Sequence, residues 1–175
     1  MLAALDAGAS MVNDVNALQA DGALDAVRQT RAAVCLMHKQ GTPENMQLDP
    51  NYREVTRDVM NYLQQRVLQA YAAGIARERI VVDPGFGFGK TMAHNLALLK
   101  NLSVFAELGV PLLVGLSRKS MLGTLTGQDV DQRLAASVAA ALIAVQKGAN
   151  IVRVHDVRET VDVLKIWNAV SEDLQ

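Results

Sequence analysis

Five short runs of apolar residues recur along the chain, separated by longer segments with a different pattern. The runs are MVNDV (11–15), AVCLM (33–37), IVV (80–82), PLLVG (111–115) and NIVRV (150–154). Between the second and third runs, Val55, Val59, Leu63 and Val67 recur at helical spacing. Near-continuous apolar strands that alternate with helices are typical of a parallel sheet covered on both faces. The pattern therefore predicts an α/β fold.

Glycine marks the predicted end of four helical segments, each just before the next apolar run. The four stretches are DAGAS, AAGIA, ELGVP and QKGAN, with glycine at positions 8, 74, 109 and 148. Glycine is favoured after a helix because the backbone there often turns left-handed, which other residues resist. This punctuation indicates repeats of one supersecondary unit.

The longest apolar run, LAASVAAALIAV (134–145), is too short to cross a membrane, which takes roughly 18 residues or more. We expect it to form a buried helix. No basic segment followed by an apolar stretch opens the chain, so we expect no signal peptide. Half of the 175 residues are hydrophobic, 20% are charged and the net charge is -1, which is the profile of a single soluble globular domain spanning 1–175.

Charge and cysteine content restrict the expected partners and compartment. No block of like charge suggests a nucleic-acid partner. Cys35 is the only cysteine, so the chain forms no internal disulfide, and we expect a cytoplasmic protein. Within an apolar run, Cys35 is better explained as a small buried hydrophobe than as a nucleophile.

Polar and charged residues collect just after each predicted strand. In a parallel α/β fold these carboxyl ends share one edge, where ligands bind. Simple exposure of the loops to water is the alternative explanation. The residues concerned are Asn13, Asp14, His38, Lys39, Asp83, Ser117 to Ser120, Arg153, His155 and Asp156.

The stretch DPGFGFGKT (83–91) is rich in glycine but matches neither nucleotide-binding motif. A P-loop would need glycine where Pro84 stands, and the G-x-G-x-G spacing departs from the dinucleotide fingerprint. The carboxylate of Asp83 can accept two parallel N–H bonds from an aminopyrimidine-like ring edge, although an acid at a turn is more often a cap. Phe86 and Phe88 can stack on a ligand or fill the base of the loop.

Two further segments supply cationic groups. In GLSRKS (115–120), a small residue leaves space in the cleft, and Arg118, Lys119 and Ser120 offer donors to an anionic ligand, unless they form only a solvated basic turn. In IVRVHDV (151–157), strand alternation directs Arg153 and His155 to one face. An arginine within an apolar strand needs a partner, which is either an anionic ligand or an internal acid.

Other site chemistries lack support. The three histidines are widely separated, without the spacing of a zinc site. GLSRK lacks the final glycine of the G-x-S-x-G nucleophile elbow.

Taken in order, the motifs NDV, CLMHKQGTPENMQ, DPGFGFGKT with HN shortly after, PLLVGLSRKS and RVHDV resemble the dihydropteroate synthase family, from about residue 5 to 165. The resemblance implies a TIM (β/α)8 barrel whose site lies at the carboxyl rim. It also implies three groups of ligand-binding residues. They are Asn13, Met37, Asp83, Lys119 and Arg153 for the pterin, Arg153 and His155 for pyrophosphate, and Phe88, Lys119 and Ser120 for p-aminobenzoate.

The implied reaction joins hydroxymethyl-dihydropterin pyrophosphate to p-aminobenzoate, giving dihydropteroate and pyrophosphate, with Lys119, Arg153 and His155 as the catalytic groups. The resemblance further implies Mg²⁺ and a possible homodimer. The usual protein ligand of that metal, an asparagine, is expected to lie in a part of the family pattern that has no counterpart here, so no metal-binding residue is predicted.

Only five strands are found against the eight of a closed barrel. We therefore expect an incomplete barrel of about five parallel βα units, truncated at its N-terminal side, with little activity in isolation. Two other hypotheses remain. One is a pterin-binding methyltransferase module, which has no pyrophosphate to hold; the other is a non-catalytic pterin-binding remnant.

Overall fold

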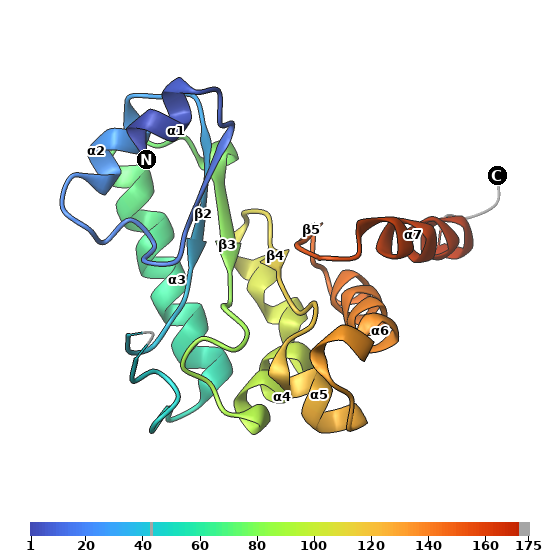
Figure 1. Cartoon of the computed structure of the whole chain (residues 1–175). Coiled ribbons are helices and arrows are strands. Elements are labelled where there is room, and N and C mark those ends of the chain that lie inside the picture. The colour runs from blue at the N-terminus through green and yellow to red at the C-terminus, as the bar shows by residue number, and fades with distance from the viewer. Residues whose placement is uncertain (43, 172–175) are drawn as a thin grey trace.

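The computed structural model describes residues 1–42 and 44–171, and this part of the chain forms one α/β layer of parallel strands covered by helices (Figure 1). The elements are, in order, α1 (Leu2–Asp6), β1 (Met11–Asp14), α2 (Ala23–Arg28), β2 (Ala33–Met37), α3 (Val55–Ala72), η1 (Arg77–Arg79), β3 (Ile80–Asp83), α4 (Met92–Lys100), η2 (Leu102–Leu108), β4 (Leu113–Val114), α5 (Ser120–Thr126), η3 (Val130–Gln132), α6 (Leu134–Gln146), β5 (Ile151–Val152) and α7 (Val157–Ser171).

The five strands are parallel and lie side by side in the order of the sequence. β1 pairs with β2, β2 with β3, and β4 with β5. A bridge between Val82 and Leu112 joins the two groups, and the Val82 N–H donates to the carbonyl of Pro111. Figure 1 shows α2 and α3 beside the first three strands and α6 and α7 at the opposite end, beyond β5. Consecutive parallel strands with helical crossovers confirm the predicted βα units.

The last two strands are shorter than the sequence predicted. The runs 111–115 and 150–154 form strands only over Leu113–Val114 and Ile151–Val152. At the start of β4, the side chain of Asn150 accepts a hydrogen bond from the Leu112 N–H in place of a backbone partner. After Val152, one more ladder bond forms, from the Arg153 N–H to the Val114 carbonyl.

The apolar run at 134–145 forms a helix, as predicted, but it is not buried all round. In α6, one face made of Ser137, Ala140, Ala141 and Ala144 is buried, whereas Leu134 and Ile143 are each 40% exposed. The prediction of a buried helix therefore holds for this face only. The main neighbours of α6 among the described residues are α5, β5 and α7, and they leave its outer face exposed.

The core divides between the two faces of the sheet. The larger cluster packs strand residues such as Leu36 and Val82 against Val59 and Leu63 of α3. On the other face lies a small cluster of Cys35, Val81 and Leu113. We call the face that carries this small cluster the inner face of the sheet. Because successive strand residues point to opposite faces, Met37, Asp83 and Gly115, two positions further along the chain, also point to the inner face. That face leads to the site described below.

The glycines at 8, 74, 109 and 148 all adopt positive φ at the ends of helical segments, as predicted, with φ between +62° and +98°. Two helix starts near the site carry side-chain caps. Glu54 accepts from the N–H groups of Thr56 and Arg57 at the start of α3, and Thr91 and His94 form a reciprocal capping box at the start of α4. These caps fix where the loops after β2 and β3 join their helices.

Candidate functional site

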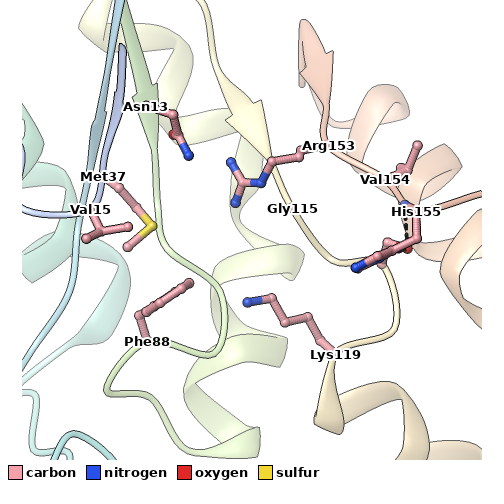
Figure 2. Close-up of a pocket in the computed structure, with 10 residues that line it drawn as sticks. Asn13, Val15, Met37, Phe88, Gly115, Lys119, Arg153, Val154 and His155 are labelled. Carbon is pink, nitrogen blue, oxygen red and sulfur yellow. Dashed lines mark hydrogen bonds between the residues drawn. The ribbon is translucent and has the colours of Figure 1, made fainter. Parts of the chain in front are cut away.

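A pocket of about 330 Å³ opens at the carboxyl ends of the strands (Figure 2). Pockets of this size and larger are typical of small-molecule sites. Figure 2 shows Asn13, Met37 and Phe88 on one side of the pocket and Arg153, Lys119 and His155 on the other. The lining residues are Asn13, Val15, Met37, Phe88, Gly115, Ser117, Lys119, Arg153, Val154 and His155.

Strand register explains why these residues meet. Asn13 pairs in register with Cys35, which lies on the inner face of the sheet. Met37 and Asp83 lie two residues beyond Cys35 and Val81 and pair with each other across β2 and β3. Gly115 lies two residues beyond Leu113. The pocket therefore lies one side-chain layer above the small cluster of Cys35, Val81 and Leu113.

Asp83 is bonded to the pocket-lining Arg153 but is not itself a lining residue, and it is only 1% exposed. Its Oδ1 accepts from the Gly85 N–H at 2.7 Å, and its Oδ2 accepts from Arg153 Nη1 at 3.2 Å. Burial raises the pKa of this carboxyl, while the Gly85 N–H and the Arg153 guanidinium oppose the shift. The cap considered from the sequence is thus present, together with an ion pair.

Arg153 departs from its predicted setting. It lies one residue beyond β5, not within an apolar strand, and its side chain is 41% exposed. Its guanidinium points toward the middle of the pocket in Figure 2 while Nη1 donates to Asp83. The internal acid expected as one alternative is therefore found, and the five N–H groups of a guanidinium leave capacity for a ligand as well.

Gly115 makes room for this arginine. A Cβ atom at position 115 would lie 2.6 Å from Arg153 Nη2. The space that the sequence predicted beside this small residue is thus taken by the guanidinium. Strand alternation also fails after Val152, because Val154 lines the pocket beside Arg153 and His155.

Lys119 and Phe88 face one another across the pocket. The Nζ atom lies 4.4 Å from the centroid of the Phe88 ring, in the geometry of a cation–π contact. Burial lowers the pKa of Lys119, and the nearby Asp83 carboxylate opposes this shift. The two phenylalanines divide the roles left open by the sequence: Phe86 is 1% exposed in the core, and Phe88 lines the pocket.

Ser117 holds His155. Its Oγ accepts from the backbone N–H of His155 at 3.2 Å and lies 3.0 Å from His155 Nδ1. A dashed line at His155 in Figure 2 marks hydrogen bonding to Ser117. When the hydroxyl donates to Nδ1, the imidazole proton is on Nε2. A neutral His155 then offers an N–H donor on the side of the ring away from Ser117.

Two neighbours of Lys119 do not join the pocket. Arg118 forms a bidentate ion pair with Asp156, at 2.5 and 3.2 Å. Its guanidinium therefore points to Asp156 and not into the pocket. Ser120 begins α5, is exposed, and is not among the lining residues. Its predicted contact with p-aminobenzoate remains a prediction.

Val15 and Val154 line the pocket but were missed by the sequence analysis. Apolar residues at strand ends carry no pattern that separates a pocket wall from the core.

The single cysteine lies near the pocket but is buried beneath it. Burial, together with the Asp83 carboxylate, raises the pKa of Cys35 to about 12, so this thiol is protonated at neutral pH. Within residues 1–42 and 44–171, no group of three His, Cys, Asp or Glu side chains could hold a metal ion. Over the same residues, no helix is both long and apolar enough to span a membrane.

Parallel βα units with a cationic pocket at the strand tips place the chain in the class of (β/α)-barrel folds. A family model described as pterin binding enzyme matches residues 1–155. The chain belongs to this pterin-binding enzyme family.

Relatives identify the branch of the family to which the chain is similar. It is 48% identical over 171 residues to the dihydropteroate synthase of Haemophilus influenzae, covering 98% of this chain and 62% of the relative. It is 55% identical to the crystal structure of dihydropteroate synthase from Stenotrophomonas maltophilia, with a TM-score of 0.96 over 99% of this chain and 66% of that one.

A third match is the Xanthomonas albilineans dihydropteroate synthase in complex with 7,8-dihydropteroate, 50% identical with a TM-score of 0.91, covering 97% of this chain and 62% of that one. The chain thus spans about three-fifths of the length of the proteins it matches. Its fold is part of their barrel, with the parallel α/β layout predicted from the sequence.

Proposed function

We propose that the chain is the C-terminal portion of a dihydropteroate synthase, a transferase that joins hydroxymethyl-dihydropterin pyrophosphate to p-aminobenzoate. One observation carries the proposal. Lys119, which follows β4, and Arg153 and His155, which follow β5, line one pocket beside the Asp83 carboxylate. The pocket-lining side chains include two cations and no acid, which suits an anionic substrate.

The pterin ring would lie against Met37, with its polar edge toward Asn13 and Asp83. Each oxygen of the Asp83 carboxylate accepts one hydrogen bond within the protein and keeps a second acceptor site. Two adjacent N–H groups of an aminopyrimidine edge match this pair of oxygens. A flat ring in this position would also contact the guanidinium of Arg153, which stacks well on planar groups.

The pyrophosphate would be held by Arg153 and His155. As the bond from the pterin methylene to the leaving oxygen breaks, negative charge grows on that oxygen, and a nearby guanidinium and imidazole N–H stabilise it. The positive charge left on the methylene carbon spreads into the ring held by Asp83.

The aminobenzoate would enter between Phe88 and Lys119, with Ser120 at the edge of its site. Its ring would stack on Phe88 and its carboxylate would meet the Lys119 ammonium. The aniline nitrogen then attacks the methylene carbon and releases its proton, giving dihydropteroate without a covalent link to the chain. The structure of the Xanthomonas relative in complex with 7,8-dihydropteroate supports this assignment, because that ligand is a dihydropteroate, as is the proposed product.

Mg²⁺ would supply further positive charge to the leaving pyrophosphate in the family's reaction. The described side chains do not fit a dedicated site for this ion, because they contain no group of three carboxylate, histidine or cysteine ligands. No step is therefore derived through a metal here.

A homodimer and a cytoplasmic location complete the proposal. Exposed apolar residues on α7, including Ile166 and Val170, support burial of this helix against another surface, such as a second copy of the chain.

The single Cys35 forms no disulfide bond within the chain, which agrees with a reducing compartment such as the cytoplasm.

Isothermal calorimetry of the 175-residue chain tests the function. We expect binding of a hydroxymethyl-pterin and, separately, of pyrophosphate. Arg153→Met should weaken pyrophosphate binding at least about tenfold, the loss expected for one charge-assisted contact. Lys165→Met, which makes a similar cation-to-apolar change on the exposed helix α7, is the matched control.

Product formation is the second measurement. Incubation with both substrates and Mg²⁺ should give little or no dihydropteroate from this chain alone. Lack of binding to pterin and to pyrophosphate would refute the function. Binding without product by a complete-length protein would favour a non-catalytic pterin-binding role, and methyl transfer to a corrinoid would favour a methyltransferase module.

A further inference from the structure

Lys90 is a buried cation outside the pocket. It is 3% exposed, and its Nζ has three neighbours within hydrogen-bond distance. These are the carbonyls of Gly85 and Phe88, at 2.9 and 3.1 Å, and Nδ1 of His38, at 2.9 Å. An ammonium group has three N–H donors and no acceptor, so the three partners match its three protons.

This match requires a particular form of His38. Its Nδ1 must carry a lone pair, so the ring is neutral with its proton on Nε2. His38 is 6% exposed and packs edge-on against Tyr62, with ring centroids 4.9 Å apart. Burial, and then the charge of Lys90, lower the pKa of His38 to about 3, in agreement with a neutral ring beside a cation.

The turn that Lys90 holds has little regular secondary structure of its own. Residues 85–90 follow β3 and lead to α4, and three of their glycines have positive φ. Their backbone is fixed mostly by side chains. Besides the two carbonyls bound by Lys90, the Gly87 carbonyl accepts from Gln47 and the Gly89 carbonyl from Tyr52.

On its other side, this turn forms the pocket. The Gly87 N–H donates to Asn95, and Gly87 lies against the side chain of Lys119. Phe88, whose carbonyl Lys90 holds, presents its ring to the Lys119 ammonium. A shift of the Phe88 carbonyl would therefore move a wall of the pocket.

We propose that Lys90, with His38 as its acceptor, is a positioning residue. It ties the glycine turn 85–90 to the end of β2 and thereby fixes the Phe88 ring opposite Lys119. The structure of the turn does not depend on which ligand binds. The consequence for the aromatic substrate rests on the proposed function.

Hydrogen exchange of the 175-residue chain tests directly whether Lys90 holds the turn 85–90. Lys90→Met keeps the length and apolar stem of the side chain but removes all three donors. We expect amides of 85–90 to exchange about tenfold faster, while amides of α3 and α6 change little. Lys165→Met is the control and should leave all three regions unchanged. No local change at 85–90, or an equal increase in all three regions, would overturn positioning in favour of no role or of a general stabilising role.

A pH profile of the unaltered chain gives a test that does not require the variant to fold. Burial lowers the pKa of Lys90 to about 7, against the opposing effect of Asp83, so the amine loses one of its three donors above neutral pH. The charged groups that face it are Asp83 at the end of β3 and Lys119 before α5, with neutral His38 after β2. Protection of 85–90, corrected for intrinsic exchange rates, should fall between pH 6 and pH 9.

Two variants show whether this pH effect comes from Lys90 or from Lys119. Lys119→Met should retain the fall, and Lys90→Met should abolish it. A fall that persists in Lys90→Met, or a flat profile in the unaltered chain, would overturn the proposal.

Ligand binding separates this inference from the proposed function. With the pterin site filled, Lys90→Met should bind 4-aminobenzoate at least about fivefold more weakly, with little change in the affinity for the pterin itself. If the unaltered chain binds neither ligand while the exchange results hold, the function fails and the positioning role stands.

Discussion

Asp83 lies where the sheet, the glycine turn and the cationic side of the pocket meet. Its carboxylate accepts from the Gly85 N–H and from Arg153, and its backbone carbonyl accepts from the His38 N–H. The buried position makes the charge costly unless these partners are kept. One side chain therefore couples the shape of the turn to the placement of the arginine.

We predict that Asp83→Asn destabilises the chain by about 1–3 kcal/mol, because Arg153 loses its acid while the amide oxygen can still accept from Gly85. The same variant should weaken pterin binding at least tenfold, since an amide offers one acceptor in place of two. Urea unfolding and calorimetry measure the two effects.

The control for this variant is Asp25→Asn, which removes the acid of an exposed ion pair with Arg28. Exposed pairs contribute little, so stability and binding should stay within about 0.5 kcal/mol of the unaltered chain. Equal effects of both variants would contradict a special role for Asp83.

His38 predicts a dependence of stability on pH. Its pKa is about 3 in the folded chain against an ordinary 6.5, so between these values the unfolded state binds more protons. The free energy of unfolding therefore decreases as pH falls from 6.5 toward 3. The His38 contribution to this loss is about 3 kcal/mol by pH 4.5.

Urea unfolding at pH 7 and pH 4.5 measures the effect. His38→Asn should show a smaller loss than the unaltered chain, since the group that binds the proton is gone. His94→Asn, in the capping box of α4, serves as the comparison variant. Identical pH losses in the His38 variant and the unaltered chain would show that His38 does not remain neutral when folded.

At the scale of elements, the turn after β3 shows why glycine is required at particular points. Gly85 has φ +69°, and a Cβ atom there would overlap the carbonyl oxygen of His38. Gly89 has φ +63° and lies against the backbone of Gln40. The turn after β3 thus packs directly on the segment after β2, backbone against backbone, and side chains are excluded between them.

Gly85→Ala should therefore cost more than conformational strain alone. The matched control is Gly127→Ala at the end of α5, where φ is +70° and no atom lies within 4 Å of the added carbon. We expect about 1–2 kcal/mol for Gly127→Ala from the left-handed backbone. Gly85→Ala should cost about 2 kcal/mol more because of the overlap. Urea unfolding compares them, and equal losses would contradict the packing described for this turn.

At the scale of the whole molecule, the chain exposes a large surface for its mass. Its accessible surface is 9983 Å² at 18.9 kDa, against about 8,300 Å² expected for a compact monomer of this size. Both outer strands, β1 and β5, lack a further partner strand among the described residues. Apolar side chains of α7 are exposed, including Val157, Ile166 and Val170.

We predict that the 175-residue chain, made alone, oligomerises or aggregates, because open strand edges and exposed apolar faces favour association. Size-exclusion chromatography with light scattering, and binding of an apolar dye, measure this. A monomer that unfolds cooperatively and binds no dye would contradict the prediction.

Several parts of this picture were predictable from the sequence because they rest on local chemistry. The five apolar runs became five parallel strands, and the helix-ending glycines took positive φ. Polar residues predicted at the carboxyl ends of the strands, among them Asn13, Lys119 and His155, gathered at one edge. Strand direction and side-chain alternation are enough to predict these features.

Other features required packing between distant segments. The length of β5, the direction of Arg118 toward Asp156, and the separation of Phe86 from Phe88 depend on neighbours far along the chain. Lys90 gave no signal of its role, since a lysine in a glycine-rich stretch is equally consistent with an exposed residue. Its burial follows from the meeting of the two loops after β2 and β3.

The sequence by itself determined the α/β class, the order of the βα units and the edge that carries the polar residues, since these follow from hydrophobic period and chain direction. Only the tertiary structure decided which of those residues share a cavity and which pair with each other. Hydrogen bonds and ion pairs form over a few ångströms, and the distances between side chains are set only when separate strands and loops pack together.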